Sequence, residues 1–353
     1  MKPQSEPASP TEQTYQLEFT GAAGEYFRIW IINAFLTVIT LGIYYPWAKV
    51  RTRRYLYAHT TLDGHAFDYL ANPIALLKGN LILATGFILL ILFQQFVPKY
   101  EGIIVLGFYM VIPYLVYKSL RFRLYHSAYR NIRMHFHGSA AESYRIYCWW
   151  SLLIPLTLGL IFPYIIYRKK KYLYDHIAYG TTPSRFNGTP RPFYSMYLAA
   201  SGILILVISI FMTLISILSS LFSESTKSDP RTMSIVIIMG YFGLIFIGAL
   251  IQQYLYSRSN NYCWNNSTLG HIRFHSSLKT WSLVGIRFTN VLAIICSLGL
   301  LIPWARIRRT RYILSHIQLI VSGDLDHFTA ALGSNDHALG DVSADFLDIE
   351  VGL

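Results

Sequence analysis

Charged residues are scarce in this chain of 353 residues. Only 14% of its residues are charged, against about 25% in an ordinary globular domain. In contrast, 53% are hydrophobic and 16% are aromatic, and the mean hydropathy is +0.37. This composition argues against a water-soluble globular enzyme and is typical of a protein with several helices of bilayer length.

Acidic residues are missing from the apolar stretches altogether. All 18 Asp and Glu residues lie outside them, whereas proton-coupled transporters usually carry an ionisable group inside the membrane. The 30 Lys and Arg residues give a net charge of +12, which predicts basic segments on the cytoplasmic side, in contact with anionic lipid headgroups. Nucleic-acid binding is disfavoured, because the basic runs are short and follow apolar stretches.

The chain also lacks the motifs of common catalytic and metal sites. Its three cysteines, Cys148, Cys263 and Cys296, are far apart and have no CxxC spacing, so we expect neither a disulfide framework nor a zinc site. No P-loop, GxGxxG, GxSxG or HExxH sequence occurs. We therefore expect no enzymatic activity, no cofactor and no bound metal.

Apolar stretches occupy most of the chain, and each has about the 20 residues that a helix needs to cross a bilayer. There are seven of them, at residues 29–48, 80–97, 102–117, 146–167, 198–222, 233–256 and 288–305. The second with the third, and the fifth with the sixth, predict two transmembrane helical hairpins. Short segments that alternate apolar and polar residues predict small cytoplasmic strands: 15–19, 64–69, 132–136 and 271–275.

The other three stretches are copies of one another. Each begins a repeat that continues past the stretch. The repeats read TLGIYYPWAKVRTRRYLYAH, TLGLIFPYIIYRKKKYLYDH and SLGLLIPWARIRRTRYILSH, and they align without a gap on Pro46, Pro163 and Pro303. This agreement predicts three homologous modules. A glycine four residues before each proline predicts, together with that proline, a kink or a helix restart; these glycines are Gly42, Gly159 and Gly299.

The repeats divide the chain into seven segments. We expect a disordered tail at 1–14, modules at 15–70, 119–188 and 259–328, transmembrane hairpins at 71–118 and 189–258, and an acidic tail at 329–353. The predicted fold class is an all-α polytopic membrane protein. Because a basic run follows every module, we favour four full spans, with modules that enter and leave on the cytoplasmic side. Seven full spans are the alternative.

A polar stripe follows the proline of each module. Arg, Tyr and His recur there at i, i+4 and i+8 on one helical face: Arg51, Tyr55, His59, Arg168, Tyr172, His176, Arg308, Tyr312 and His316. The stripe could bind phosphate or carboxylate groups, or it could cap the module while Arg reaches the headgroups. Embedded amides could line a solute path or join helices: Asn33, Asn290 and Gln252.

With these motifs the chain resembles the YjgN family of bacterial inner-membrane proteins, whose function is uncharacterised. The resemblance is carried by FTGAAGEYFRIW, TLGIYYPWAKVRTRRY and TLDGHAFDY in the first module, and it covers residues 15–328. The middle module departs from the pattern at Tyr164, Ile165 and Ile166. The resemblance implies a multi-pass inner-membrane protein and supplies no catalytic residues.

For function we therefore expect a transporter or channel-like protein for a small or amphiphilic solute, including an anionic one. A membrane scaffold or lipid-binding protein is the alternative. The expected partners are membrane lipids with anionic headgroups and a small solute, and nucleic acid is not among them.

Overall fold

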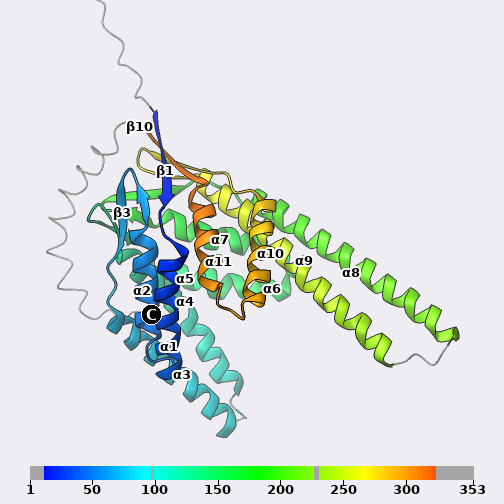
Figure 1. The fold of residues 1–353 in the computed structure, drawn as a ribbon. Coiled ribbons are helices and arrows are strands. Elements are labelled where there is room, and N and C mark those ends of the chain that lie inside the picture. The colour runs from blue at the N-terminus through cyan, green and yellow to red at the C-terminus, as the bar shows by residue number, and fades with distance from the viewer. Residues whose placement is uncertain (1–11, 97–98, 100, 226–229, 323–353) are drawn as a thin grey trace, which may run out of the picture.

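Ten strands form one closed antiparallel barrel in the computed structural model, which describes residues 12–96, 99, 101–225 and 230–322 (Figure 1). The acidic tail predicted at 329–353 lies outside the described residues, as does the N-terminal tail up to residue 11. The strands are β1 (Glu12–Phe19), β2 (Thr60–Leu62), β3 (His65–Tyr69), β4 (Ser127–Tyr129), β5 (Ile132–Phe136), β6 (Ile177–Tyr179), β7 (Thr182–Phe186), β8 (Ser267–Leu269), β9 (Ile272–Ser276) and β10 (Ile317–Ser322). Each strand pairs with the next one along the chain, and β1 closes the barrel on β10.

The prediction of an all-α fold is therefore wrong. The four segments predicted as strands are present as β1, β3, β5 and β9, but they belong to one barrel rather than to separate small pieces. The other six strands were not predicted. β7 and β10 have five and six residues, whereas β2, β4, β6 and β8 have three residues each and directly follow helices. Three residues are too few to display a period of two.

Five helical hairpins connect the strands, and each leaves and re-enters the same end of the barrel (Figure 1). They are α1 (Ala23–Ile39) with α2 (Tyr45–Ala58), α3 (Pro73–Phe96) with α4 (Glu101–Tyr125), α5 (Ala140–Tyr144) through a π-helical segment (Arg145–Trp149) and α6 (Trp150–Leu156) with α7 (Phe162–Asp175), α8 (Arg191–Ser225) with α9 (Pro230–Asn265), and α10 (Thr280–Cys296) with α11 (Ile302–Leu314). Neighbouring hairpins pack in chain order and α11 packs on α1, so the helices form a closed ring.

The modules reverse direction at the glycine, where a kink or a restart was predicted. The helix restart is confirmed, since α2 begins with Pro46 in its first turn. Leu41 and Gly42 have φ of 49° and 91°, and the Gly42 N–H donates to the Thr37 carbonyl at 2.8 Å, as in a Schellman turn. The Thr40 hydroxyl then accepts the Tyr44 N–H at 3.0 Å. Two short helices thus take the place of the single span that the seven-span alternative put at 29–48.

The same turn ends the first helix of the other two modules. Leu158 with Gly159, and Leu298 with Gly299, have the same pair of positive φ angles. The Thr157 and Ser297 hydroxyls cap the returning helices as Thr40 does. The repeated Thr/Ser-Leu-Gly sequence is therefore the signature of a tight helical turn.

The barrel decides between the two predicted topologies. One closed barrel contains the strands on both sides of every helical hairpin, so all three basic runs return to the same end. Seven full spans would carry the middle run to the opposite side and are incompatible with this arrangement.

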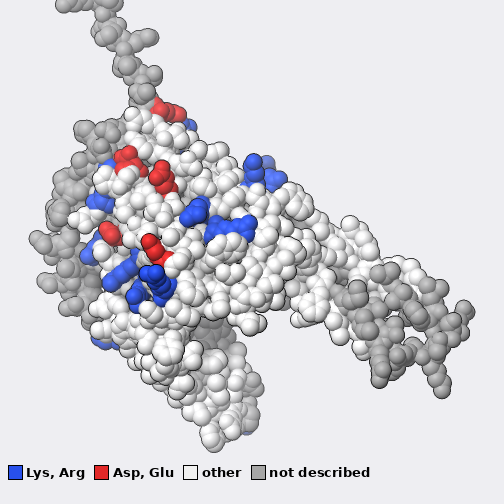
Figure 2. All heavy atoms as spheres, in the orientation of Figure 1, with Lys and Arg blue, Asp and Glu red and all other residues white. Residues whose placement is uncertain are grey.

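Long apolar helices are fewer than predicted. Within the described ranges, two helices are long and apolar enough to cross a bilayer, α3 and α8 as far as Ile217, where four spans were expected. On the face shown in Figure 2, charged side chains gather near the barrel, and the described helical surface away from it is almost uncharged.

Candidate functional site

The barrel encloses an apolar chamber of about 470 Å³. Residues from all ten strands line its wall, among them Leu17, Phe67 and Met134. Its floor contains one residue from near the end of each helix that returns to the barrel, namely Tyr57, Leu124, Tyr174, Trp264 and Leu314. Pockets of roughly 300–1,000 Å³ with apolar walls are usual for small-molecule ligands. The chamber is therefore large enough for a ligand.

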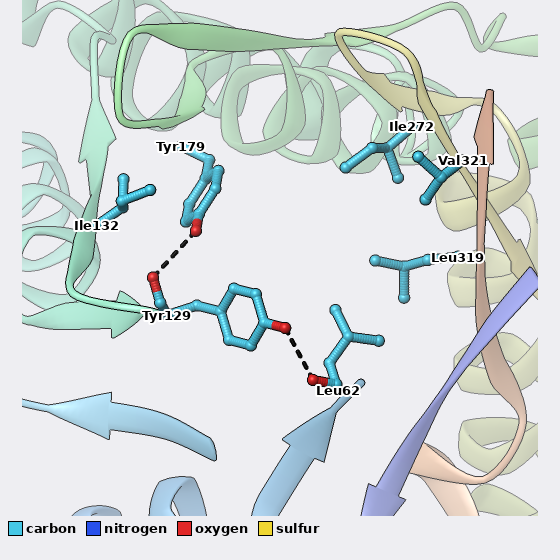
Figure 3. Packing of buried hydrophobic residues seen from close by; sticks show 7 residues of the cluster. All are labelled: Leu62, Tyr129, Ile132, Tyr179, Ile272, Leu319 and Val321. Carbon is cyan, nitrogen blue, oxygen red and sulfur yellow. Dashed lines mark hydrogen bonds between the residues drawn. The ribbon is translucent and has the colours of Figure 1, made fainter. Parts of the chain in front are cut away.

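A cluster of buried side chains from six strands packs inside the barrel (Figure 3), and five of its seven residues also line the chamber. The Tyr129 hydroxyl donates to the Leu62 carbonyl at 2.8 Å, and the Tyr179 hydroxyl donates to the Tyr129 carbonyl at 3.0 Å. Buried hydroxyls are costly without such partners. The rest of the cluster is aliphatic, consisting of Leu62, Ile132, Ile272, Leu319 and Val321. We call these seven residues the plug.

Every returning helix ends in the same cap. The ring nitrogen Nδ1 of His59, His126, His176 and His316 lies 2.8–2.9 Å from the carbonyl four residues earlier. Asn266 makes the equivalent bond with its amide. The carbonyl of each capping residue accepts an N–H from the adjoining strand or linker. The predicted His59, His176 and His316 therefore join helices to the barrel.

The structural unit is thus repeated five times, although three copies were predicted. The two missed copies lie in the predicted transmembrane hairpins. Their signal in the sequence is an aromatic residue four positions before the cap, in FRLYH at 122–126 and YCWNN at 262–266. The other positions of these two copies differ from the three modules, so an alignment on the module prolines does not find these copies.

The stripe tyrosines connect the two helices of their modules. The Tyr55 hydroxyl accepts the Ala22 N–H at 2.9 Å, and the Tyr172 hydroxyl donates to the Ser139 carbonyl at 2.9 Å. Tyr312 accepts the Lys279 N–H at 3.1 Å. Ala22, Ser139 and Lys279 are the N-cap residues of the outgoing helices, so each tyrosine fixes the start of one helix against the other.

The stripe arginines have three different environments. Arg308 donates to Thr289 Oγ1 at 2.6 Å and to Asn290 Oδ1 at 3.3 Å. Arg168 lies 3.9 Å from the Glu142 carboxylate, and Arg51 is exposed. They belong to three different helical hairpins, so the structure does not bring the stripes together into one site.

The predicted embedded amides are also dispersed. Asn33 Nδ2 donates to the Ala48 carbonyl at 3.4 Å, and Asn290 Nδ2 donates to the Ala305 carbonyl at 3.1 Å, so each bridges the two helices of its module. Gln252 is exposed on α9. In the middle module Trp150 occupies the place of Asn33 and packs on Tyr164, with ring centroids 5.2 Å apart. In the middle module an aromatic pair, Trp150 and Tyr164, thus stands where the first module has Asn33 and Trp47.

The metal-binding and thiol side chains of the described residues do not converge on one site. Across the part of the chain that is described, no three His, Cys, Asp or Glu residues cluster as metal ligands do. All three cysteines are free, Cys148 and Cys263 buried and Cys296 exposed. The chamber, which sequence reasoning missed, is therefore the strongest candidate site.

Comparison with known proteins identifies the family. A family model described as a bacterial protein of unknown function (DUF898) matches residues 14–346. Inner membrane protein YjgN of Salmonella typhimurium is 30% identical over 152 residues, which are 43% of this chain and 38% of the relative. Inner membrane protein YjgN of Escherichia coli K12 is 26% identical over 153 residues, 42% of this chain and 36% of the relative. Each alignment therefore spans less than two-fifths of the curated relative.

No solved structure matches the chain, so the assignment rests on sequence. The family match covers most of the chain, and the curated relatives are inner-membrane proteins. The chain belongs to the DUF898 family, together with YjgN, and is a bacterial inner-membrane protein of a family without a known function.

Proposed function

We propose that this protein binds a single-chain amphiphile from the cytoplasmic leaflet and holds its apolar chain in the barrel chamber. The apolar chamber of about 470 Å³, lined in part by the plug, is the observation that carries the proposal. Each methylene moved from water into such a site contributes about 0.8 kcal/mol. An alkyl chain of moderate length would therefore bind with useful affinity.

Water is a poor occupant for this chamber. A buried water needs two to four polar partners, and the hydroxyls deep in the chamber already bond to carbonyls. The plug hydroxyls bond to carbonyls, and Ser184 and Ser267 donate to the carbonyls of Tyr174 and Cys263 at 2.7 Å. An apolar ligand makes the contacts that water cannot make.

The placement of the helices supports a membrane source for the ligand. The three module turns present Leu41, Leu158 and Leu298, which are 93%, 92% and 95% exposed. Such side chains suit a hydrocarbon environment. With the turns in the leaflet and the basic runs near the headgroups, the chamber floor lies close to the membrane surface. An amphiphile then needs to move only a short distance to enter.

Passage of a small water-soluble solute has less support. The plug makes the barrel interior apolar, and Asn33 and Asn290 are engaged between helices. A polar pathway would need groups that remain available to a solute. Amphiphile binding uses the features that are present.

Photolabelling tests the proposal. A long-chain alcohol with a diazirine at the end of its chain is incubated with the full protein in phosphatidylcholine nanodiscs, and labelled peptides are mapped by mass spectrometry. We expect labels on chamber residues such as Phe67, Met134 and Phe274. Met134→Trp fills the chamber and should abolish this labelling, whereas Leu89→Trp, on the exposed surface of α3, should not. Labels confined to the outer surfaces of α3 and α8 would contradict the proposal.

A further inference from the structure

The geometry points to Arg123 as the binding site for an anionic headgroup, so that the chamber ligand is a single-chain carboxylate or phosphate. This inference rests on the proposed function of the chamber. Arg123 is the one charged residue among the described residues that line the chamber. It lies on α4, three residues before the His126 cap, and therefore beside the floor.

The Arg123 side chain is exposed, and the Tyr69 and Tyr147 hydroxyls are near enough to feel its charge. Its guanidinium makes no hydrogen bond or ion pair with any residue in the described ranges. The Ser127 hydroxyl donates to the Arg123 carbonyl at 2.9 Å, and Tyr57 lies 3.1 Å from the same hydroxyl. These bonds fix the backbone at the end of α4, and the guanidinium donors stay available.

The fivefold repeat shows that the fold does not require a cation at this position. The residues three before the cap in the other four returning helices are Leu56, Leu173, Cys263 and Ile313. All four are apolar. An arginine in one copy, where four copies have an uncharged residue, indicates a role other than joining helix to strand.

The chemistry of the guanidinium selects the ligand. An exposed cation at the edge of an apolar chamber attracts a ligand that carries an opposite charge next to its apolar chain. Carboxylates and phosphates accept two parallel N–H bonds from one guanidinium, which an alcohol or an ammonium group cannot do. The ligand therefore places its chain in the barrel and its anion against Arg123.

Competition among matched ligands tests the inference on the full chain in phosphatidylcholine nanodiscs. Alkyl carboxylate, alkyl phosphate, alcohol and trimethylammonium with one chain length compete with the photoreactive alcohol. For the wild type, we expect the anions to compete at concentrations about tenfold or more below the alcohol, as charged hydrogen bonds imply, and the ammonium to be weakest. The carboxylate and phosphate arms distinguish a fatty acid from a phosphate-bearing lipid.

Variants at Arg123 separate this role from folding. Arg123→Leu, which introduces the residue of two equivalent helices, should fold and bind the alcohol normally but lose the preference for anions. Arg123→Lys should keep part of it, because the charge remains and the two-pronged geometry does not. Lys118→Gln, on the same helix but away from the chamber lining, is the matched control and should bind as the wild type does.

The outcomes are distinguishable. If all four ligands compete equally with the wild type, or if Arg123→Leu retains the anion preference, the headgroup inference is wrong and the chamber proposal stands. If the photoreactive alcohol does not label the chamber at all, the proposed function itself fails.

Discussion

Replacement of Gly42 by alanine should destabilise the first module through its backbone alone. Gly42 has φ of 91°, and a Cβ atom built there would meet nothing within 4 Å. The cost is therefore conformational and not steric crowding from neighbours. An L-residue in the left-handed region costs roughly 1–2 kcal/mol. The preceding residue, Leu41, also has a positive φ of 49°. Two consecutive residues with side chains would then both have positive φ in the Gly42→Ala variant.

Gly107 in the middle of α4 is the matched control. A Cβ atom there also meets nothing within 4 Å, and its φ is ordinary. Alanine in a helix interior is favoured over glycine by about 1 kcal/mol. Gly42→Ala and Gly107→Ala should thus differ by about 2–3 kcal/mol in stability, although each adds one methyl group to open space. Gly42→Asn should fall between Gly42→Ala and the wild type, because asparagine tolerates positive φ.

Thermal unfolding in a single detergent, followed by circular dichroism, measures this difference. The combined Gly42→Ala, Gly159→Ala and Gly299→Ala variant should lose about 3–6 kcal/mol, since distant sites add. The order of melting temperatures is the decisive result. If Gly42→Ala and Gly107→Ala melt together, or if the triple variant melts with the wild type, the assigned turn geometry is wrong.

Three further predictions concern the junctions and the thiols. Gly138→Ala should cost about 1–3 kcal/mol by overpacking, because its Cβ would lie 2.6 and 2.8 Å from two aromatic rings; Gly24→Ala, with open space around it, should melt at or above the wild-type temperature. Tyr172→Phe should lose about 1 kcal/mol with its bond to Ser139, while native mass spectrometry should find bound lipid unchanged; reduced lipid retention at an equal folded fraction would indicate a binding role instead. Burial raises the pKa of Cys263 to about 11, so at pH 8 it remains a thiol and maleimide should leave it unlabelled in the folded protein. Fast labelling of Cys263 would contradict its burial.

The candidate site could be anticipated less well than the individual helices and strands. The i, i+4, i+8 spacing places Arg, Tyr and His on one helix, but the bond between Tyr55 and the Ala22 backbone is a tertiary contact. In the sequence, Arg123 is one of several basic residues that follow the apolar stretch at 102–117. Its distinction appears only when the five returning helices are superposed by their caps, because the repeat is too divergent to align from sequence.

Local interactions allowed the sequence alone to predict the module turns, the helix restarts at Pro46, Pro163 and Pro303, and four of the strands. In each case neighbouring residues determine the conformation, through the ring of proline, the absence of a side chain on glycine, or the alternation of a strand. Membrane location followed from composition in the same way. Barrel closure did not, because β3 must pair with β4 across two long helices, and three-residue strands carry no pattern of their own. The chamber exists only once all ten strands have closed, so only the tertiary structure could decide which side chains face it.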